Sequence, residues 1–142
     1  KQDMEVVVDY PPIWDRAAAA FDLTGRKPLF AWGDMIFNPL AGEIDDHMLV
    51  HEDVHSRQQA AFGGVAPILE WWEKYLTDPV FRLEQEIEAY RVQYESYCEE
   101  QTDRNRRHKY LLSLAADLSA PFYRCDISAG DAYSAIKAPT LL

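Results

Sequence analysis

The stretch DHMLVHEDVHSRQQAAF, residues 46–62, carries the pattern that decides the fold of this chain. Asp45 before it is a good N-cap residue, and the pair Gly63-Gly64 follows it, so the stretch predicts one helix with a defined start and end. Its middle reads His51-Glu52-Asp53-Val54-His55, which is the motif H-E-x-x-H. Random order would give this motif in roughly 0.8% of chains of the same composition.

The spacing of the motif suits a metal site when the motif lies on a helix. Residues four positions apart lie one above the other on a helix face, so His51 and His55 can bind one metal ion from the same side. Glu52 is rotated by about 100° from His51, which places it beside such an ion, where a general base for a metal-bound water belongs. The alternative is a helix with two ordinary histidines and a solvated glutamate.

A catalytic zinc site also needs a third protein ligand and one open position for water. We expect the ligand on the long helix that Thr77-Asp78-Pro79 starts and that extends to about Gln101. Spacing alone does not choose among its three acids, Glu84, Glu86 and Glu88. Glu86 is the favoured ligand because a carboxylate drawn toward the core needs a partner, and it adjoins an apolar stripe formed by Leu83, Ile87, Tyr90 and Tyr94.

Together, the first motif with Gln58-Gln59 and the later run Glu86-Ile87-Glu88-Ala89-Tyr90 resemble the gluzincin group of zinc metallopeptidases, in particular its minimal phage and bacterial members. The family pattern has H-E-x-x-H on one helix and a Glu on a second helix, commonly within E-x-x-A-D. On this pattern Glu86 matches the ligand, and Tyr90 stands where an Asp usually orients a ligand histidine. That departure keeps Glu88 open as an alternative ligand. The resemblance covers residues 29–97.

The resemblance implies a zincin-like fold, a Zn²⁺ ion bound by His51, His55 and Glu86, and hydrolysis of peptide bonds with Glu52 as the base. It also gives residues 35–37 a role, as an edge strand that pairs with an extended peptide substrate. A hairpin strand that only covers the core is an equal alternative. The second functional hypothesis is a catalytically inactive zincin-like binding or structural domain. A di-iron protein is disfavoured, because Glu52 and His55 form the one Glu-x-x-His pair of the sequence.

The rest of the sequence predicts a single, mostly helical α+β domain over residues 1–142. Residues 4–8 and 28–38 are typical of short strands, the second region with a hairpin turn at Gly33-Asp34. Besides the two helices already described, the start and stop signals predict helices at about residues 13–23, 67–76, 105–119 and 129–137. We therefore expect a small sheet or hairpin near the N-terminus and an active-site helix packed on the Glu-bearing helix.

Composition narrows the class of protein. The chain has 142 residues and a net charge of −10, which argues against binding of nucleic acid or anionic lipid. No apolar run approaches the ~18 residues of a membrane-spanning helix, and no basic and apolar leader is seen. Cys98 and Cys125 are too few for a disulfide scaffold, so we expect reduced thiols in a cytoplasmic protein. The expected partner is a peptide or protein substrate.

The remaining histidines and the cysteines are expected outside the metal site. His47 lies one turn before His51 and is expected at the surface near the helix start. His108 lies in a basic run that is typical of a solvated helix start. A deformylase-like site with Cys98 or Cys125 is disfavoured, because the cysteine of peptide deformylases precedes their H-E-x-x-H motif.

Overall fold

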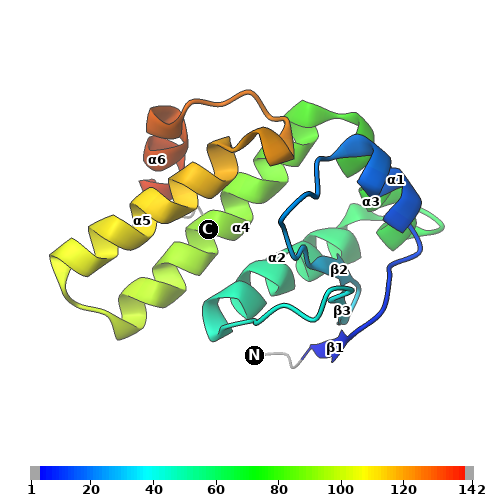
Figure 1. The fold of residues 1–142 in the computed structure, drawn as a ribbon, viewed down its shortest axis with the longest axis horizontal. Coiled ribbons are helices and arrows are strands. Elements are labelled where there is room, and N and C mark those ends of the chain that lie inside the picture. Colours follow the sequence, from blue (N-terminus) through cyan, green and yellow to red (C-terminus); the bar gives the residue numbers. More distant parts are fainter. Residues whose placement is uncertain (1–3, 140–142) are drawn as a thin grey trace.

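The computed structural model describes residues 4–139, and this part of the chain is an α+β fold in which helices dominate (Figure 1). The elements in chain order are β1 (Glu5–Val7), α1 (Trp14–Ala20), β2 (Phe30–Trp32), β3 (Met35–Phe37), α2 (Asp46–Phe62), α3 (Pro67–Thr77), α4 (Pro79–Glu100), α5 (Arg104–Ser119), the 3-10 helix η1 (Pro121–Tyr123) and α6 (Ala129–Lys137). No helix in residues 4–139 combines the length and the apolar character that crossing a bilayer requires.

Side-chain caps explain where most of the long helices begin. The Asp45 carboxylate accepts a hydrogen bond from the Met48 N–H at 2.9 Å and starts α2. Asp78, Asp103 and Ser128 act in the same way at the starts of α4, α5 and α6. These residues satisfy N–H groups that have no partner within the first helical turn. The predicted helix bounds therefore agree with the structure to within about a residue for α2 to α6.

The sheet has the strand order β1-β3-β2, with β1 parallel and β2 antiparallel to β3. Gly33 makes the turn between β2 and β3 at a φ of 62°, which suits glycine. The prediction that residues 35–37 form an edge strand is wrong, since β3 is the central strand and both of its edges are paired. A strand before α1 supplies the second pairing, which the sequence of the hairpin alone does not indicate.

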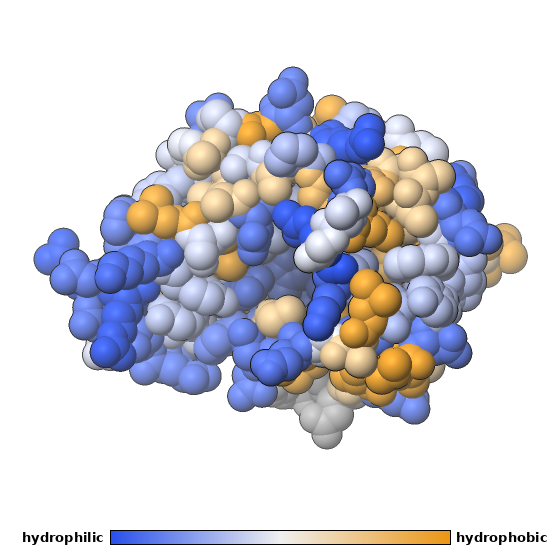
Figure 2. All heavy atoms as spheres, viewed as in Figure 1, coloured by the Kyte–Doolittle hydropathy of each residue, from blue (hydrophilic) through white to orange (hydrophobic). Residues whose placement is uncertain are grey.

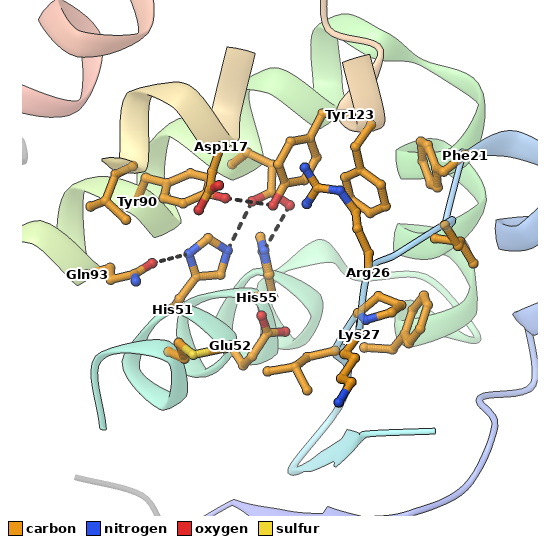
Figure 3. Close-up of a pocket in the computed structure, with 18 of the residues that line it drawn as sticks. Phe21, Arg26, Lys27, His51, Glu52, His55, Tyr90, Gln93, Asp117 and Tyr123 are labelled. Atoms are coloured by element: carbon orange, nitrogen blue, oxygen red, sulfur yellow. Dashed lines mark hydrogen bonds and ion pairs between the residues drawn. The ribbon is translucent and has the colours of Figure 1, made fainter. Parts of the chain in front are cut away.

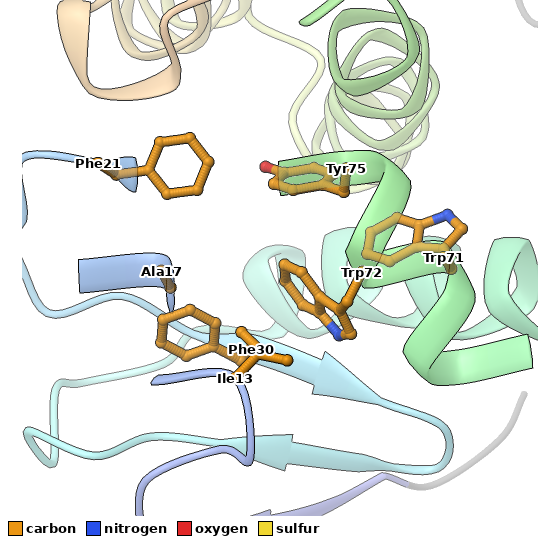
Figure 4. Packing of buried hydrophobic residues seen from close by; sticks show 7 residues of the cluster. All are labelled: Ile13, Ala17, Phe21, Phe30, Trp71, Trp72 and Tyr75. Carbon is orange, nitrogen blue, oxygen red and sulfur yellow. The ribbon is translucent and has the colours of Figure 1, made fainter. Parts of the chain in front are cut away.

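The buried apolar residues form two hydrophobic clusters. The first joins α1, β2 and α3 around a fully buried Trp71, with Ile13, Ala17, Phe21, Phe30, Trp72 and Tyr75 (Figure 4). The second joins α4, α5 and α6, with Tyr90, Leu111, Leu114, Ala115, Leu118, Ala132 and Ile136. Figure 1 shows α5 and α6 beyond α4 on one side of the molecule and α1 and α3 on the other.

The buried side chains of α2 are mostly polar. They are His51, Glu52, Val54, His55, Ser56 and Gln59. Burying polar groups is unfavourable unless they have partners, and here the partners come from α4 and from the β2–β3 hairpin. Gln59, for example, donates to the Ala31 carbonyl at 2.9 Å and accepts from the Gly33 N–H at 2.8 Å. The polar interior of the fold is therefore organised around α2.

Candidate metal centre

The two motif histidines lie one turn apart on α2 (Figure 3), and both of them contact one carboxylate of α4. Nε2 of His51 is 3.0 Å from Oε1 of Glu86, and Nε2 of His55 is 3.1 Å from Oε2 of the same residue. All three residues are buried, with exposed fractions of 6% for His51, 4% for His55 and 2% for Glu86. Three groups that bind metal ions thus converge in the interior of the protein.

The opposite nitrogen of each histidine is held by a glutamine. Nδ1 of His51 lies 2.8 Å from Oε1 of Gln93, and Nδ1 of His55 lies 2.8 Å from Oε1 of Gln58. An amide oxygen only accepts hydrogen bonds, so Nδ1 is the donor in both pairs. Each Nε2 is then the nitrogen that remains for a metal ion. Such hydrogen bonds commonly orient metal-binding histidines.

Further contacts fix the two glutamines. The Gln93 amide donates to the hydroxyl of Tyr110 at 2.9 Å. The Gln58 amide donates to the Gln85 carbonyl at 3.0 Å and to the Glu88 carboxylate at 2.7 Å. These bonds direct both amide oxygens at the histidine rings, so the ring orientation is set by a connected network rather than by two isolated contacts.

The structure separates the acids that the sequence left open. Glu86 is buried against the histidines, and the Tyr75 hydroxyl donates to its Oε2 at 2.6 Å. Glu88 is exposed and bonds to Gln58 instead, and Glu84 is exposed as well. Glu86 is therefore the acid of α4 that lies with His51 and His55.

Glu52 is buried beside the two histidines. One atom each of His51, Glu52 and His55 lies within 4.8 Å of the other two, and this group could hold a metal ion. Figure 3 shows Glu52 on the side of the histidines that faces Lys27, away from Tyr90 and Tyr123. The centre thus has two carboxylates in different positions, Glu86 between the Nε2 atoms and Glu52 to one side.

Burial and charge shift the pKa values of these groups in different directions. Burial raises the pKa of Glu52 above its ordinary value, although His51 and His55 partly oppose this. Burial would also raise the pKa of Glu86, but the two histidines outweigh it and hold that pKa far below its usual range. For His55, burial would lower the pKa, and the Glu86 carboxylate outweighs burial and raises it to about 9. In the absence of a metal, Glu86 and His55 therefore form an ion pair at neutral pH.

A cavity of about 510 Å³ opens onto these residues. Both hydrophobic clusters contribute to its wall, as do Arg26, Lys27, Asp45, Asp117 and Tyr123. The Tyr90 ring lies edge-on to His51, with 4.5 Å between the ring centroids, and its hydroxyl is 2.8 Å from that of Tyr123. In the space-filling view this face of the molecule is hollowed near its centre (Figure 2).

Buried Arg82 connects the cavity wall to α3. Its guanidinium donates to the Tyr123 carbonyl at 2.7 Å and to the Tyr75 carbonyl at 2.6 Å, and more weakly to the Arg124 carbonyl at 3.2 Å. Residues 121–124 are thereby attached to α3, which carries Tyr75, and to α4, which carries Glu86. Arg82 positions two tyrosines of the cavity without lining it.

Several of these residues were not found from the sequence. Gln93 follows Glu86 by seven residues, which is two helical turns, and this spacing is the signal that could have found it. Nothing in the local pattern indicates Tyr75, Arg82 or Tyr123, because their roles depend on tertiary contacts.

The other histidines and the cysteines lie outside the centre, as expected. His47 is half-buried, with Nδ1 3.0 Å from the Ser96 hydroxyl, so it is less exposed than predicted. His108 lies 2.9 Å from the Tyr133 hydroxyl through its Nδ1. Cys98 and Cys125 are free thiols.

Comparison of the chain with protein-family models, with curated proteins and with solved structures finds no match.

Proposed function

We propose that this protein is a zinc-dependent hydrolase of peptide or related amide bonds. In this proposal His51, His55 and Glu86 hold the ion, and Glu52 is the general base. The observation that carries it is the convergence of the two Nε2 atoms on Glu86 at 3.0 and 3.1 Å, while a glutamine oxygen holds each Nδ1. Nitrogen and carboxylate ligands of this kind are typical of catalytic zinc sites with three protein ligands.

The charge of the centre supports the choice of a divalent cation. Glu52 and Glu86 bring two carboxylates into a buried space, and isolated buried charges are strongly unfavourable. Glu86 is partly compensated by protonated His55 in the metal-free protein. A divalent ion would replace that proton and compensate both acids.

Glu52 has the properties that a general base at this centre requires. A metal ion, when bound, lowers the pKa of a coordinated water and polarises a carbonyl group. Burial raises the pKa of Glu52, which brings this carboxylate closer to the range in which it can accept a proton and return it. Glu52 would take the proton of the attacking water and later deliver it to the leaving amine.

Metal analysis and one substitution test the proposal. We expect about one zinc ion per chain after refolding with zinc and dialysis, and uptake should be lost in His51→Ala. Glu52→Gln should keep the metal and lose cleavage of a fluorogenic peptide library. Zinc content below about a tenth of an equivalent, with no uptake on titration, would contradict the metal site.

The same experiment tests the alternative of an inactive domain. Full zinc occupancy with a large rise in Tm, but without cleavage of any library member, would favour a structural or binding role for the centre. Full activity of Glu52→Gln would instead show that the base is another residue.

A further inference from the structure

The cavity has a cationic side that the proposed chemistry does not use. Arg26 and Lys27 line the cavity from the segment between α1 and β2, whereas the proposed metal ligands lie on α2 and α4. Arg26 is half-buried, and its guanidinium carbon lies 4.3 Å from the centre of the Phe122 ring. Figure 3 shows its side chain extending toward Tyr123. Stacking on an aromatic ring leaves the edge of a guanidinium free to donate hydrogen bonds.

Among the arginines of residues 4–139 that are not fully exposed, Arg26 is the one whose guanidinium forms no hydrogen bond or ion pair. Arg82, Arg91 and Arg107 donate to backbone carbonyls, and Arg16 and Arg57 pair with carboxylates. The others whose side chains lack such partners are exposed, and they are Arg104, Arg106 and Arg124. Arg26 is thus a partly desolvated arginine whose donors face a cavity.

Asp117 lies in the same wall but does not neutralise Arg26. The charge of Arg26 acts on Asp117, yet the two side chains form no ion pair. Burial raises the pKa of Asp117. The cavity therefore keeps an unpaired cationic group available to an anionic ligand. The acids that share the lining, Asp45, Glu52, Glu86 and Asp117, would weaken the binding of such a ligand.

We propose that Arg26 binds the C-terminal carboxylate of a short peptide whose scissile bond lies at the metal centre. This inference rests on the proposed function and names its substrate class, which is peptides cleaved close to a free C-terminus. The planar guanidinium matches a carboxylate through two parallel hydrogen bonds. The cavity volume of about 510 Å³ falls in the range of small-ligand pockets, and it opens onto both Arg26 and the metal centre.

Binding, rather than turnover, gives the decisive test. The probes are a mixture of N-acetylated tripeptides with free C-terminal carboxylates and the same mixture amidated at the C-terminus. Each of the two mixtures is titrated calorimetrically into the zinc-loaded Glu52→Gln variant and, in a separate experiment, into the metal-free protein. We expect the free acids to bind about 10- to 100-fold more tightly than the amides. The preference should persist in the metal-free protein, because the carboxylate contacts Arg26 rather than the ion.

Substitutions then assign the preference to one side chain. Arg26→Gln should remove the difference between acids and amides, whereas Arg106→Gln, at an exposed arginine outside the cavity, should leave it unchanged. Asp117→Asn should enlarge the preference, because it removes a negative charge from the same wall. Circular dichroism checks that the variants fold.

The outcomes separate this inference from the proposed function. Equal affinity for acids and amides, binding of neither form, or a preference that survives Arg26→Gln overturns the role of Arg26. A preference that disappears in Arg26→Gln, in a protein that cleaves neither mixture, supports carboxylate binding while contradicting the hydrolase proposal. Equal cleavage of both mixtures would support the hydrolase and overturn the C-terminal specificity.

Discussion

Nδ1 of His51 lies 2.8 Å from Oε1 of Gln93, so a residue 42 positions later in the chain orients the first histidine of the motif. The family resemblance gives this orienting role to an Asp at the position of Tyr90. Here the Tyr90 ring packs against His51 instead, and Gln93, one turn further along α4, makes the hydrogen bond. On α4, the side chain that contacts Nδ1 of His51 is therefore Gln93 and not residue 90.

We expect Gln93→Leu to weaken zinc binding by about 10- to 100-fold, because the His51 ring loses the acceptor that orients it. Gln93→Glu keeps an acceptor at this position and should retain most of the affinity. Competition with a chromogenic chelator measures both values. Equal affinities in Gln93→Leu and the unmodified protein would mean that packing against Tyr90 suffices to orient His51.

Glu86→Gln and Glu88→Gln form a matched pair on α4. Glu86→Gln should reduce zinc affinity by at least about 100-fold, because it removes a buried anionic ligand. Glu88→Gln should change affinity by less than about threefold, because Glu88 is exposed and contacts Gln58 rather than the histidines. The reverse order of the two effects would move the third ligand to Glu88.

The metal-free protein should lose stability as the pH rises from about 6.5 to about 9. The pKa of His55 is raised to about 9, so the protonated ring stabilises the fold fully below its ordinary pKa of 6.5 and ceases to do so as the pH passes 9. The loss is on the order of 3 kcal/mol. Urea unfolding in the presence of a chelator measures it, and Glu86→Gln should flatten the profile.

At acid pH the free energy of unfolding depends on pH in the opposite direction, and it decreases as the pH falls. The pKa of Glu86 lies below its ordinary value of 4.5, so its contribution is present above that pH and is lost as the pH falls through its pKa in the folded protein.

Zinc uptake near pH 7 should also release a proton, since the ion displaces the one on His55. A free energy of unfolding that increases between pH 6.5 and 9 would contradict the ion pair.

Arg82→Met should destabilise the protein by about 2–4 kcal/mol, because three carbonyl oxygens lose their charged donor. The substitution should also disorder the tyrosines of the cavity, which a change in near-ultraviolet circular dichroism would report. Arg124→Met, at an exposed neighbour, is the control and should cost less than about 0.5 kcal/mol. Equal stability of the two variants would remove the structural role given to Arg82.

Much of this arrangement could be predicted from local signals in the sequence. The caps Asp45, Asp78 and Ser128 determine where α2, α4 and α6 begin, and they are recognisable from residue type and spacing alone. The i, i+4 spacing of His51 and His55 likewise predicts their shared face. The α+β class followed from the helix signals together with the apolar segments near the N-terminus.

What could not be predicted depends on contacts between distant segments. The parallel pairing of β1 with β3 leaves no local trace, because strands of three residues carry too little pattern to specify a neighbour. The preference for Glu86 over Glu88 depended on a core-facing stripe, and only the packing of α2 against α4 separates the two acids in space. Nothing in the sequence around Arg26 singles it out, because its position matters through Phe122 and the cavity, far from it in sequence.

The wall of the cavity has a consequence for the order in which the centre is assembled. His51, Glu52, His55 and Glu86 all precede residues 110–123, which supply one side of the enclosure. A chain growing from its N-terminus therefore contains every proposed ligand before it contains the segment that shields them. An ion reaches the nascent centre before that wall exists, whereas in the folded, metal-free molecule it has to pass through the cavity that residues 110–123 help to enclose. We expect loading during refolding to be faster than loading of the folded protein.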